Sequence, residues 1–195
     1  MKEVKYAKRM IVEVWSEISD ILALTAKPEV ISFAGGLPAP ELFPVEDMKR
    51  MANEVLDEVG TVALQYSSAQ GFPKFRQQIA DRMNAKQKTN VAADDILVTS
   101  GSQQALEFSG KIFIDEGDVI LCESPTYLGA LNAFNGYGPK YIEVETDEDG
   151  MNMEALEKVL QTTDRVKMIY VIPDFQNPTG RTWPIEKRKK FVELI

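Results

Sequence analysis

Three short segments of the sequence combine residues that could bind a phosphate, a flat ring and an oxygen atom. In Thr99–Gln104 a glycine lies between two serines, and two glutamines follow. Glu123–Tyr127 contains a proline and ends in a tyrosine, and Pro173–Gly180 holds two prolines, a glycine and Asn177. Each segment follows an apolar run typical of a β-strand. Ligands of open parallel sheets bind outside the carboxyl ends of the strands, so these segments are the candidate site.

The first segment has the composition of a turn that leads from a strand into a helix. The free N–H groups and the dipole at the start of a helix form an anion site suited to phosphate. Ser102 is the candidate ligand, and the alternative is that Ser102 only caps the helix. The segment is not a Walker loop, because no Gly-Lys-Ser/Thr follows at the required spacing.

The other two segments could supply a ring platform and an amide. Tyr127 offers a flat ring, and the alternative is a core tyrosine at a helix start. Pro125 suits the first turn of that helix. Asn177 can donate from its amide to an oxygen, and the alternative there is a plain turn, in which either X-Pro bond could be cis. Three such segments at one end of a sheet favour a ligand site over three unrelated turns.

Hydrophobic periodicity predicts the elements that must position these segments. Apolar residues spaced three and four apart predict an amphipathic helix over Ala7–Thr25. Farther along, short β-rich runs alternate with helical segments, which implies βαβ units and a parallel sheet covered on both faces, the α/β doubly wound class. The expected strands are Ile96–Thr99, Val119–Cys122, Tyr141–Val144 and Val166–Ile172, and the expected helices are Val45–Val59, Pro73–Lys86, Gln103–Ile114, Thr126–Asn135 and Met153–Gln161. Asp147–Gly150 reads as a surface turn.

Composition argues against several classes of function. The 30 acidic and 22 basic side chains give a net charge of −8, which makes nucleic acid an unexpected partner. Histidine is absent and Cys122 is the single cysteine, so neither a Ser/His or Cys/His pair nor a cysteine/histidine zinc site is expected, and we expect no metal. A reducing, cytoplasmic location fits one unpaired thiol. No charge-free apolar run reaches the roughly 18 residues of a membrane span, so no membrane partner is expected.

Five motifs of the chain also occur together in one enzyme family, in the same order. They are Ser32–Pro38, Tyr66–Gly71, Ser100–Leu106, Ser124–Tyr127 and Asn177–Gly180. In this combination they resemble the class I/II aminotransferases, which are pyridoxal-phosphate enzymes of fold type I. Within that family the sequence resembles the branch that contains α-aminoadipate and kynurenine aminotransferases.

The resemblance implies a role for each matching residue. Ser102 and Gln103 would hold the phosphate of pyridoxal 5′-phosphate, Tyr127 would stack on its pyridine ring, and Asn177 would donate to the phenolic oxygen of the ring. These implied roles agree with the anion site, the ring platform and the amide donor inferred from the residues themselves.

The resemblance also implies partners and a domain plan. Tyr66 would reach the phosphate of the neighbouring subunit in a homodimer, and Gly36 would lie beside the substrate carboxylate. The substrates would be an α-amino acid and a 2-oxo acid. Residues 1–44 would form an N-terminal helical arm and a small-domain segment, and residues 45–195 the first part of the large cofactor-binding domain.

One part of the family pattern has no counterpart in the sequence. The reaction needs a lysine that holds the cofactor as a Schiff base, in a Ser-x-x-Lys or Ser-x-Ser-Lys context, and no such segment is present. We therefore expect an N-terminal portion of the enzyme that is inactive alone, with Ile96–Thr99 left without a neighbouring strand and Val166–Ile172 left as a sheet edge. The alternatives are another fold type I enzyme, such as a carbon–sulfur lyase, and a non-catalytic binding module.

Overall fold

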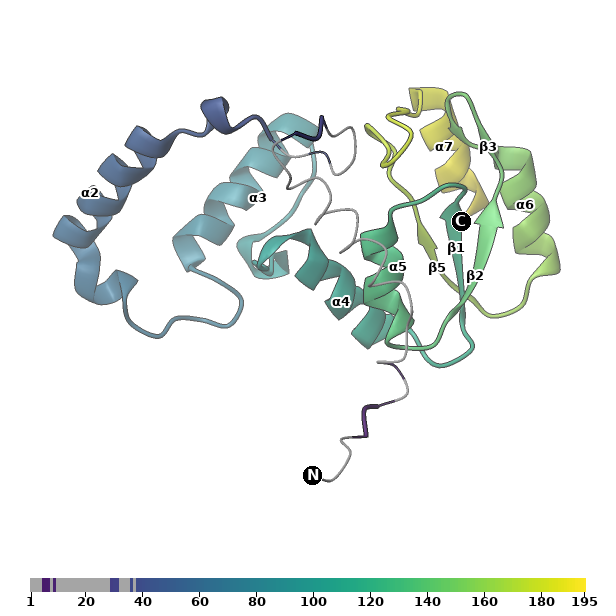
Figure 1. Ribbon diagram of the computed structural model, residues 1–195, viewed down its shortest axis with the longest axis horizontal. Coiled ribbons are helices and arrows are strands. Elements are labelled where there is room, and N and C mark those ends of the chain that lie inside the picture. The colour runs from purple at the N-terminus through teal and green to yellow at the C-terminus, as the bar shows by residue number, and fades with distance from the viewer. Residues whose placement is uncertain (1–4, 8, 10–28, 32–35, 37) are drawn as a thin grey trace. The chain divides into compact units, whose positions relative to one another are not determined.

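The computed structural model describes residues 5–7, 9, 29–31, 36 and 38–195 (Figure 1). Apart from Ala7 and Arg9, the helix expected over Ala7–Thr25 lies outside the described residues, as does most of Ser32–Pro38. The chain divides into two compact units, with a boundary between Thr99 and Ser100. The expected boundary between residues 44 and 45 stays a prediction.

The described part of the unit that ends at Thr99 is helical. Its elements are the 3-10 helix η2 (Pro40–Leu42), α2 (Val45–Ala63), α3 (Pro73–Gln87) and the 3-10 helix η3 (Ala93–Asp95). Both expected α-helices are confirmed, although α2 continues beyond the predicted end through a non-helical residue, Val59. Pro73 starts α3 with a φ suited to the first turn, and Lys88 ends it in the left-handed conformation.

The expected strand at Ile96–Thr99 is wrong for the described chain. These residues belong to no helix or strand. The Val98 N–H donates to the carbonyl oxygen of Gln70 in a loop, at 2.9 Å, and not to a neighbouring strand. A β-rich run becomes a strand only where a partner strand completes its hydrogen bonds, and the described residues supply none, as expected for this segment.

The unit that follows Thr99 contains the expected parallel sheet. Its strand order is β2 (Lys140–Val144), β1 (Val119–Glu123), β5 (Val166–Tyr170), and both pairings are parallel. The helices of this unit are α4 (Gly101–Phe113), α5 (Leu128–Asn135), α6 (Met153–Thr162) and α7 (Ile185–Leu194). In the described chain β5 has one neighbour, so it is an edge of the sheet, as expected.

Helices cover both faces of this sheet. Figure 1 shows α4 and α5 on one side of the strands, and α6 and α7 on the other. Ile120 of β1 packs in the core cluster that contains Phe134 of α5, whereas Leu121 packs in the cluster that contains Leu156 of α6. All five residues of β1 are buried. The alternation of side chains along a fully buried strand therefore builds the two-sided core.

A short hairpin confirms the expected surface turn. β3 (Thr146–Asp147) pairs antiparallel with β4 (Gly150–Met151). Gly150 has a φ of +114°, and an added Cβ would lie 2.2 Å from the ring of Trp183. The hairpin therefore packs directly against the segment that precedes α7. No helix in the described part of the chain is long and apolar enough to cross a membrane.

Candidate functional site

The start of α4 has the geometry expected of an anion site. The chain turns at Gly101, whose φ of +77° lies in the region that favours glycine. Ser102 and Gln103 follow in the first turn, and both are exposed. The N-cap position belongs to Ser100, whose side chain makes no capping hydrogen bond. The alternative that Ser102 is the cap is therefore wrong, and the N–H groups of this turn lie at the positive end of the helix dipole.

Tyr127 stands at the N-cap of α5, directly after the loop that leaves β1. Its ring lies against the backbone of Gly129, where an added Cβ would be 2.4 Å from the ring carbon Cζ. Gln103 reaches the same backbone, since its Nε2 donates to the carbonyl oxygen of Gly129 at 2.9 Å. A glycine at this position therefore lets the tyrosine ring and the start of α4 approach α5 closely.

The expectation that Pro125 lies in the first turn of this helix is wrong. The helix begins at Leu128, three residues later. The carbonyl oxygen of Pro125 accepts a hydrogen bond from Nε2 of Gln176 at 2.8 Å. Pro125 therefore belongs to the loop between β1 and α5, where it is bonded to the loop that follows β5.

Asn177 lies in the loop between β5 and α7. The Asn177–Pro178 peptide bond is cis, which agrees with the cis bond considered for this loop, and Ser124–Pro125 is cis as well. Asn177 is exposed, whereas Gln176 before it is 2% exposed. Within the described chain the Asn177 side chain has no hydrogen-bond partner. Its amide is therefore available to a ligand.

A pocket of about 470 Å³ brings three of the expected site residues together. Its lining is Ser102, Ala105, Leu106, Ser109, Tyr127, Tyr170, Ile172 and Asn177. Small-molecule sites in proteins typically have volumes of roughly 300–1,000 Å³. The three segments singled out in the sequence thus meet at one concave surface, at the carboxyl end of the sheet.

Five of the lining residues have no role assigned from the sequence, although two periodic patterns mark them. Residues 102, 105, 106 and 109 have the spacing of one face of a helix, so a site at Ser102 extends along α4. Tyr170 and Ile172 alternate at the end of β5, as side chains on one face of a strand do. The same two periodicities that predict the core thus also indicate these lining residues.

The lining of the pocket carries no charge that would repel an anion. None of the eight lining residues is a carboxylate or a cation. Burial raises the pKa of Tyr170 above its ordinary value, with a smaller contribution from the neighbouring Tyr127. Tyr170 therefore stays a neutral phenol at physiological pH, and no negative charge of the lining opposes a phosphate.

Two expected site residues belong to the other compact unit. Tyr66 is fully exposed, and its backbone N–H donates to Oε1 of Gln65 at 2.7 Å. Gly36 is exposed, and an added Cβ would meet nothing within 4 Å. The pocket is lined by residues of the second unit alone, so the roles of Tyr66 and Gly36 stay predictions.

Curated relatives identify the kind of protein to which this chain is similar. It is 44% identical over 180 residues to a 2-aminoadipate transaminase of Thermus thermophilus. It is 45% identical over 183 residues to aromatic-amino-acid aminotransferase 1 of Thermococcus litoralis. Each match covers 92% of this chain but 44% of the relative. The chain therefore spans less than half the length of these two relatives.

Solved structures confirm the fold. The kynurenine aminotransferase of Pyrococcus horikoshii, in complex with PMP, matches with a TM-score of 0.89 and 38% identity, over 97% of this chain and 48% of that one. The α-aminoadipate aminotransferase of Thermus thermophilus, complexed with N-(5′-phosphopyridoxyl)-L-leucine, matches with a TM-score of 0.82 and 40% identity, over 97% and 46%. The parallel sheet with helices on both faces is thus part of the fold type I architecture.

A family model assigns most of the sequence at once. The model for aminotransferases of class I and II matches residues 29–195. That range contains all six residues expected to bind cofactor or substrate. The chain belongs to the class I and II aminotransferase family.

Proposed function

We propose that this chain is the N-terminal portion of a pyridoxal-phosphate-dependent aminotransferase that moves an amino group from an α-amino acid to a 2-oxo acid. The observation that carries the proposal is the convergence of Ser102, Tyr127 and Asn177 on one pocket. Family membership supports the reaction type. The aminoadipate and kynurenine aminotransferases among the relatives make their substrates the first candidates to test.

The residues of the pocket fit the cofactor that the family implies. A phosphate needs N–H and hydroxyl donors, which the first turn of α4 and Ser102 offer. A pyridine ring needs a flat apolar partner, and the ring of Tyr127 is one. Gly129 leaves room for the tyrosine ring at this position. The phenolic oxygen of the cofactor needs a donor, and the exposed amide of Asn177 is one. No carboxylate lines the pocket to repel the phosphate.

The chain's own residues orient the cofactor and tune its electronic state. With the cofactor bound, Ser102 and the backbone N–H of Gln103 would hold its phosphate, Tyr127 would stack on its ring, and Asn177 would donate to its phenolic oxygen. When bound, the cofactor supplies the electron sink for proton removal at the substrate α-carbon. The lysine needed for that proton transfer is not provided by a Ser-x-x-Lys context in this sequence, so we expect the 195-residue chain to be inactive by itself.

A transfer assay on the full-length gene product tests the reaction. The protein is incubated with pyridoxal phosphate, a ¹⁵N-labelled amino acid and an unlabelled 2-oxo acid, and we expect ¹⁵N in the amino acid formed from the oxo acid. Release of ammonia or sulfide without transfer would favour a lyase. Binding without any turnover would favour a non-catalytic module.

The 195-residue chain provides a second test. Pyridoxal phosphate is added to it, borohydride follows, and the product is dialysed and digested. We expect no single lysine to carry the reduced cofactor in mass spectra. One stoichiometrically modified lysine would contradict the proposal that the chain lacks the nucleophile.

A homodimer whose Tyr66 completes the neighbouring site, in the cytoplasm, is the remaining part of the proposal. The full exposure of Tyr66 in the described chain supports the dimer part of this proposal. Mixing full-length Tyr66→Phe and Asn177→Ala proteins should restore some activity, because one of the two sites in a hybrid dimer would be intact. A mixture no more active than its components would contradict this arrangement.

A further inference from the structure

A buried carboxylate links the end of β1 to the loop that carries Asn177. Glu123 is 1% exposed. Its Oε2 accepts from the backbone N–H of Ile172 at 3.1 Å, and its Oε1 accepts from Nε1 of Trp183 at 3.0 Å. Ile172 precedes the Asn177 loop and Trp183 follows it. Glu123 therefore fastens both ends of that loop to β1.

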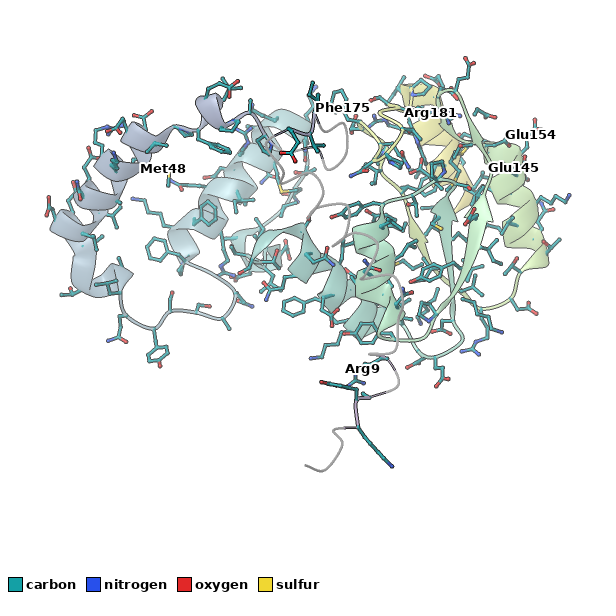
Figure 2. All side chains as sticks on the ribbon, in the orientation of Figure 1. Arg9, Met48, Glu145, Glu154, Phe175 and Arg181 are labelled. Atoms are coloured by element: carbon teal, nitrogen blue, oxygen red, sulfur yellow. The ribbon has the colours of Figure 1, made fainter. Side chains whose placement is uncertain are left out.

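A buried amide links the middle of the same loop to the segment before Tyr127. Gln176 is 2% exposed, and its Nε2 donates to the carbonyl oxygen of Pro125 at 2.8 Å. Its Oε1 accepts from both the backbone N–H and the hydroxyl of Thr179, at 2.9 and 2.7 Å. All polar atoms of this side chain are thus used. Figure 2 labels Phe175 and Arg181, which lie in this loop before and after Gln176.

Burial of these two side chains is costly unless each bond is made. An unpaired buried polar group costs about 1–3 kcal/mol, and a charged one costs more. Glu123 has no ion pair within the described chain, so its two neutral donors carry the whole compensation. Such a fully bonded, buried arrangement permits one relative position of the two loops and penalises others.

We propose that Glu123 and Gln176 are positioning residues: together they clamp the Tyr127 loop to the Asn177 loop and so set the distance between the ring platform and the amide donor. The loop clamp consists of the two hydrogen bonds that Glu123 accepts from Ile172 and Trp183 and the one that Gln176 donates to Pro125. The proposal rests on the proposed function, because it assigns the clamp a role toward a pyridoxal-type cofactor. Neither residue lines the pocket, so each acts through its neighbour.

Two nearly isosteric variants of the full-length protein open the clamp. Glu123→Gln keeps one acceptor oxygen but places an NH₂ against one of the two donors. Gln176→Glu keeps the acceptor for Thr179 but places an oxygen against the carbonyl of Pro125. The variants break different bonds, so the failure of one to fold leaves the other as a test. Matched exchanges at exposed positions of α6, Glu154→Gln and Gln161→Glu, are the controls.

The main readout is the non-covalent binding of pyridoxamine 5′-phosphate, which is measured through the fluorescence of this probe. We expect each clamp variant to bind about tenfold more weakly, which corresponds to about 1.4 kcal/mol. We expect the emission maximum of the bound probe to shift in the direction that Asn177→Ala produces. In the Asn177→Ala background Gln176→Glu should add little, because residues that act through one contact are not additive. The α6 controls should bind like wild type.

Three results would overturn the clamp as a positioning device. They are unchanged affinity and emission in both variants, losses that add fully in the double variant, and a lower melting temperature with unchanged probe binding.

Hydrogen exchange without cofactor separates this inference from the proposed function. The backbone N–H of Ile172 or the indole Nε1–H of Trp183 should exchange faster in Glu123→Gln than in wild type, and equal rates would refute the clamp itself. Wild-type protein that binds no probe would instead refute the proposed function.

Discussion

Gly129→Ala should weaken cofactor binding while leaving the stability of the fold almost unchanged. Gly129 is the second residue of α5, and an added Cβ would lie 2.4 Å from Cζ and 2.5 Å from Oη of Tyr127. Carbon atoms in contact are about 3.5–4.0 Å apart. The tyrosine ring must therefore move by about 1 Å or more, away from the position that lines the pocket.

The size of the effect follows from what the ring contributes. An aromatic pair adds about 0.5–1.5 kcal/mol beyond its buried area, so losing the stacking position should weaken pyridoxamine phosphate binding roughly two- to tenfold. The helix itself gains from the change, because alanine is favoured over glycine in helices by up to about 1 kcal/mol. That gain offsets part of the strain of moving the ring, so the free energy of unfolding should change by no more than about 1 kcal/mol.

A fluorescence titration with pyridoxamine phosphate and a urea denaturation curve, both on the full-length protein, measure the two quantities. Gly136→Ala is the matched control, because it lies at the end of the same helix and its added Cβ meets nothing within 4 Å. Unchanged affinity in Gly129→Ala would refute the role of Tyr127 as a ring platform. An equal loss in Gly136→Ala would show that the effect comes from α5 and not from the ring.

Three further predictions concern the cofactor contacts, the buried thiol and the ion pair between Asp174 and Arg188. In the full-length enzyme Asn177→Ala should mainly slow amino transfer, and Ser102→Ala should mainly weaken cofactor retention. Each effect should be roughly 10- to 150-fold, the amount expected for one lost hydrogen bond to a charged group. An unchanged rate and an unchanged cofactor affinity in both variants would contradict the assignment of the site. Cys122 is 1% exposed and burial raises its pKa to about 11, so iodoacetamide at pH 8 should leave the native thiol unmodified and alkylate it in denaturant, as peptide mass spectra will report. The Arg188 guanidinium holds the pKa of Asp174 below its ordinary value. The stabilisation by this pair is therefore present above about pH 4 and is lost as the pH falls through the lowered pKa. The difference in urea midpoint between wild type and Arg188→Gln should shrink in acid, and a difference that stays constant with pH would contradict this prediction.

Local patterns predicted most of the elements in the described chain. β1, β2 and β5 were predicted from apolar runs, and the described helices predicted from periodicity occur with shifts of a few residues at their ends. β5 ends at Tyr170, two residues before the predicted end, because the N–H of Ile172 donates to Glu123 and not to a strand. Ile96–Thr99 is β-rich but forms no strand in the described chain, which agrees with the expectation that it is left without a neighbouring strand.

The site was only partly predictable, because some of its residues depend on partners that are distant in sequence. Ser102, Tyr127 and Asn177 were found because each follows a strand, and the pocket contains all three. Glu123 and Gln176 were not singled out, because charged and amide side chains are usually exposed. The burial of Glu123 depends on Ile172 and Trp183, which lie 49 and 60 residues away in sequence. The burial of Gln176 depends on Pro125, which lies 51 residues away. Pairings over such separations leave no periodic signal.

The central claim is that the start of α4, Tyr127 and Asn177 form one pyridoxal-phosphate site. A crystal structure of the full-length protein with pyridoxal phosphate tests it most directly. We predict a phosphate within hydrogen-bond distance of Ser102 and Gln103, the pyridine ring stacked on Tyr127, and the ring oxygen within hydrogen-bond distance of the Asn177 amide. Cofactor density at another place, with this pocket empty or filled by the protein's own side chains, would contradict the account.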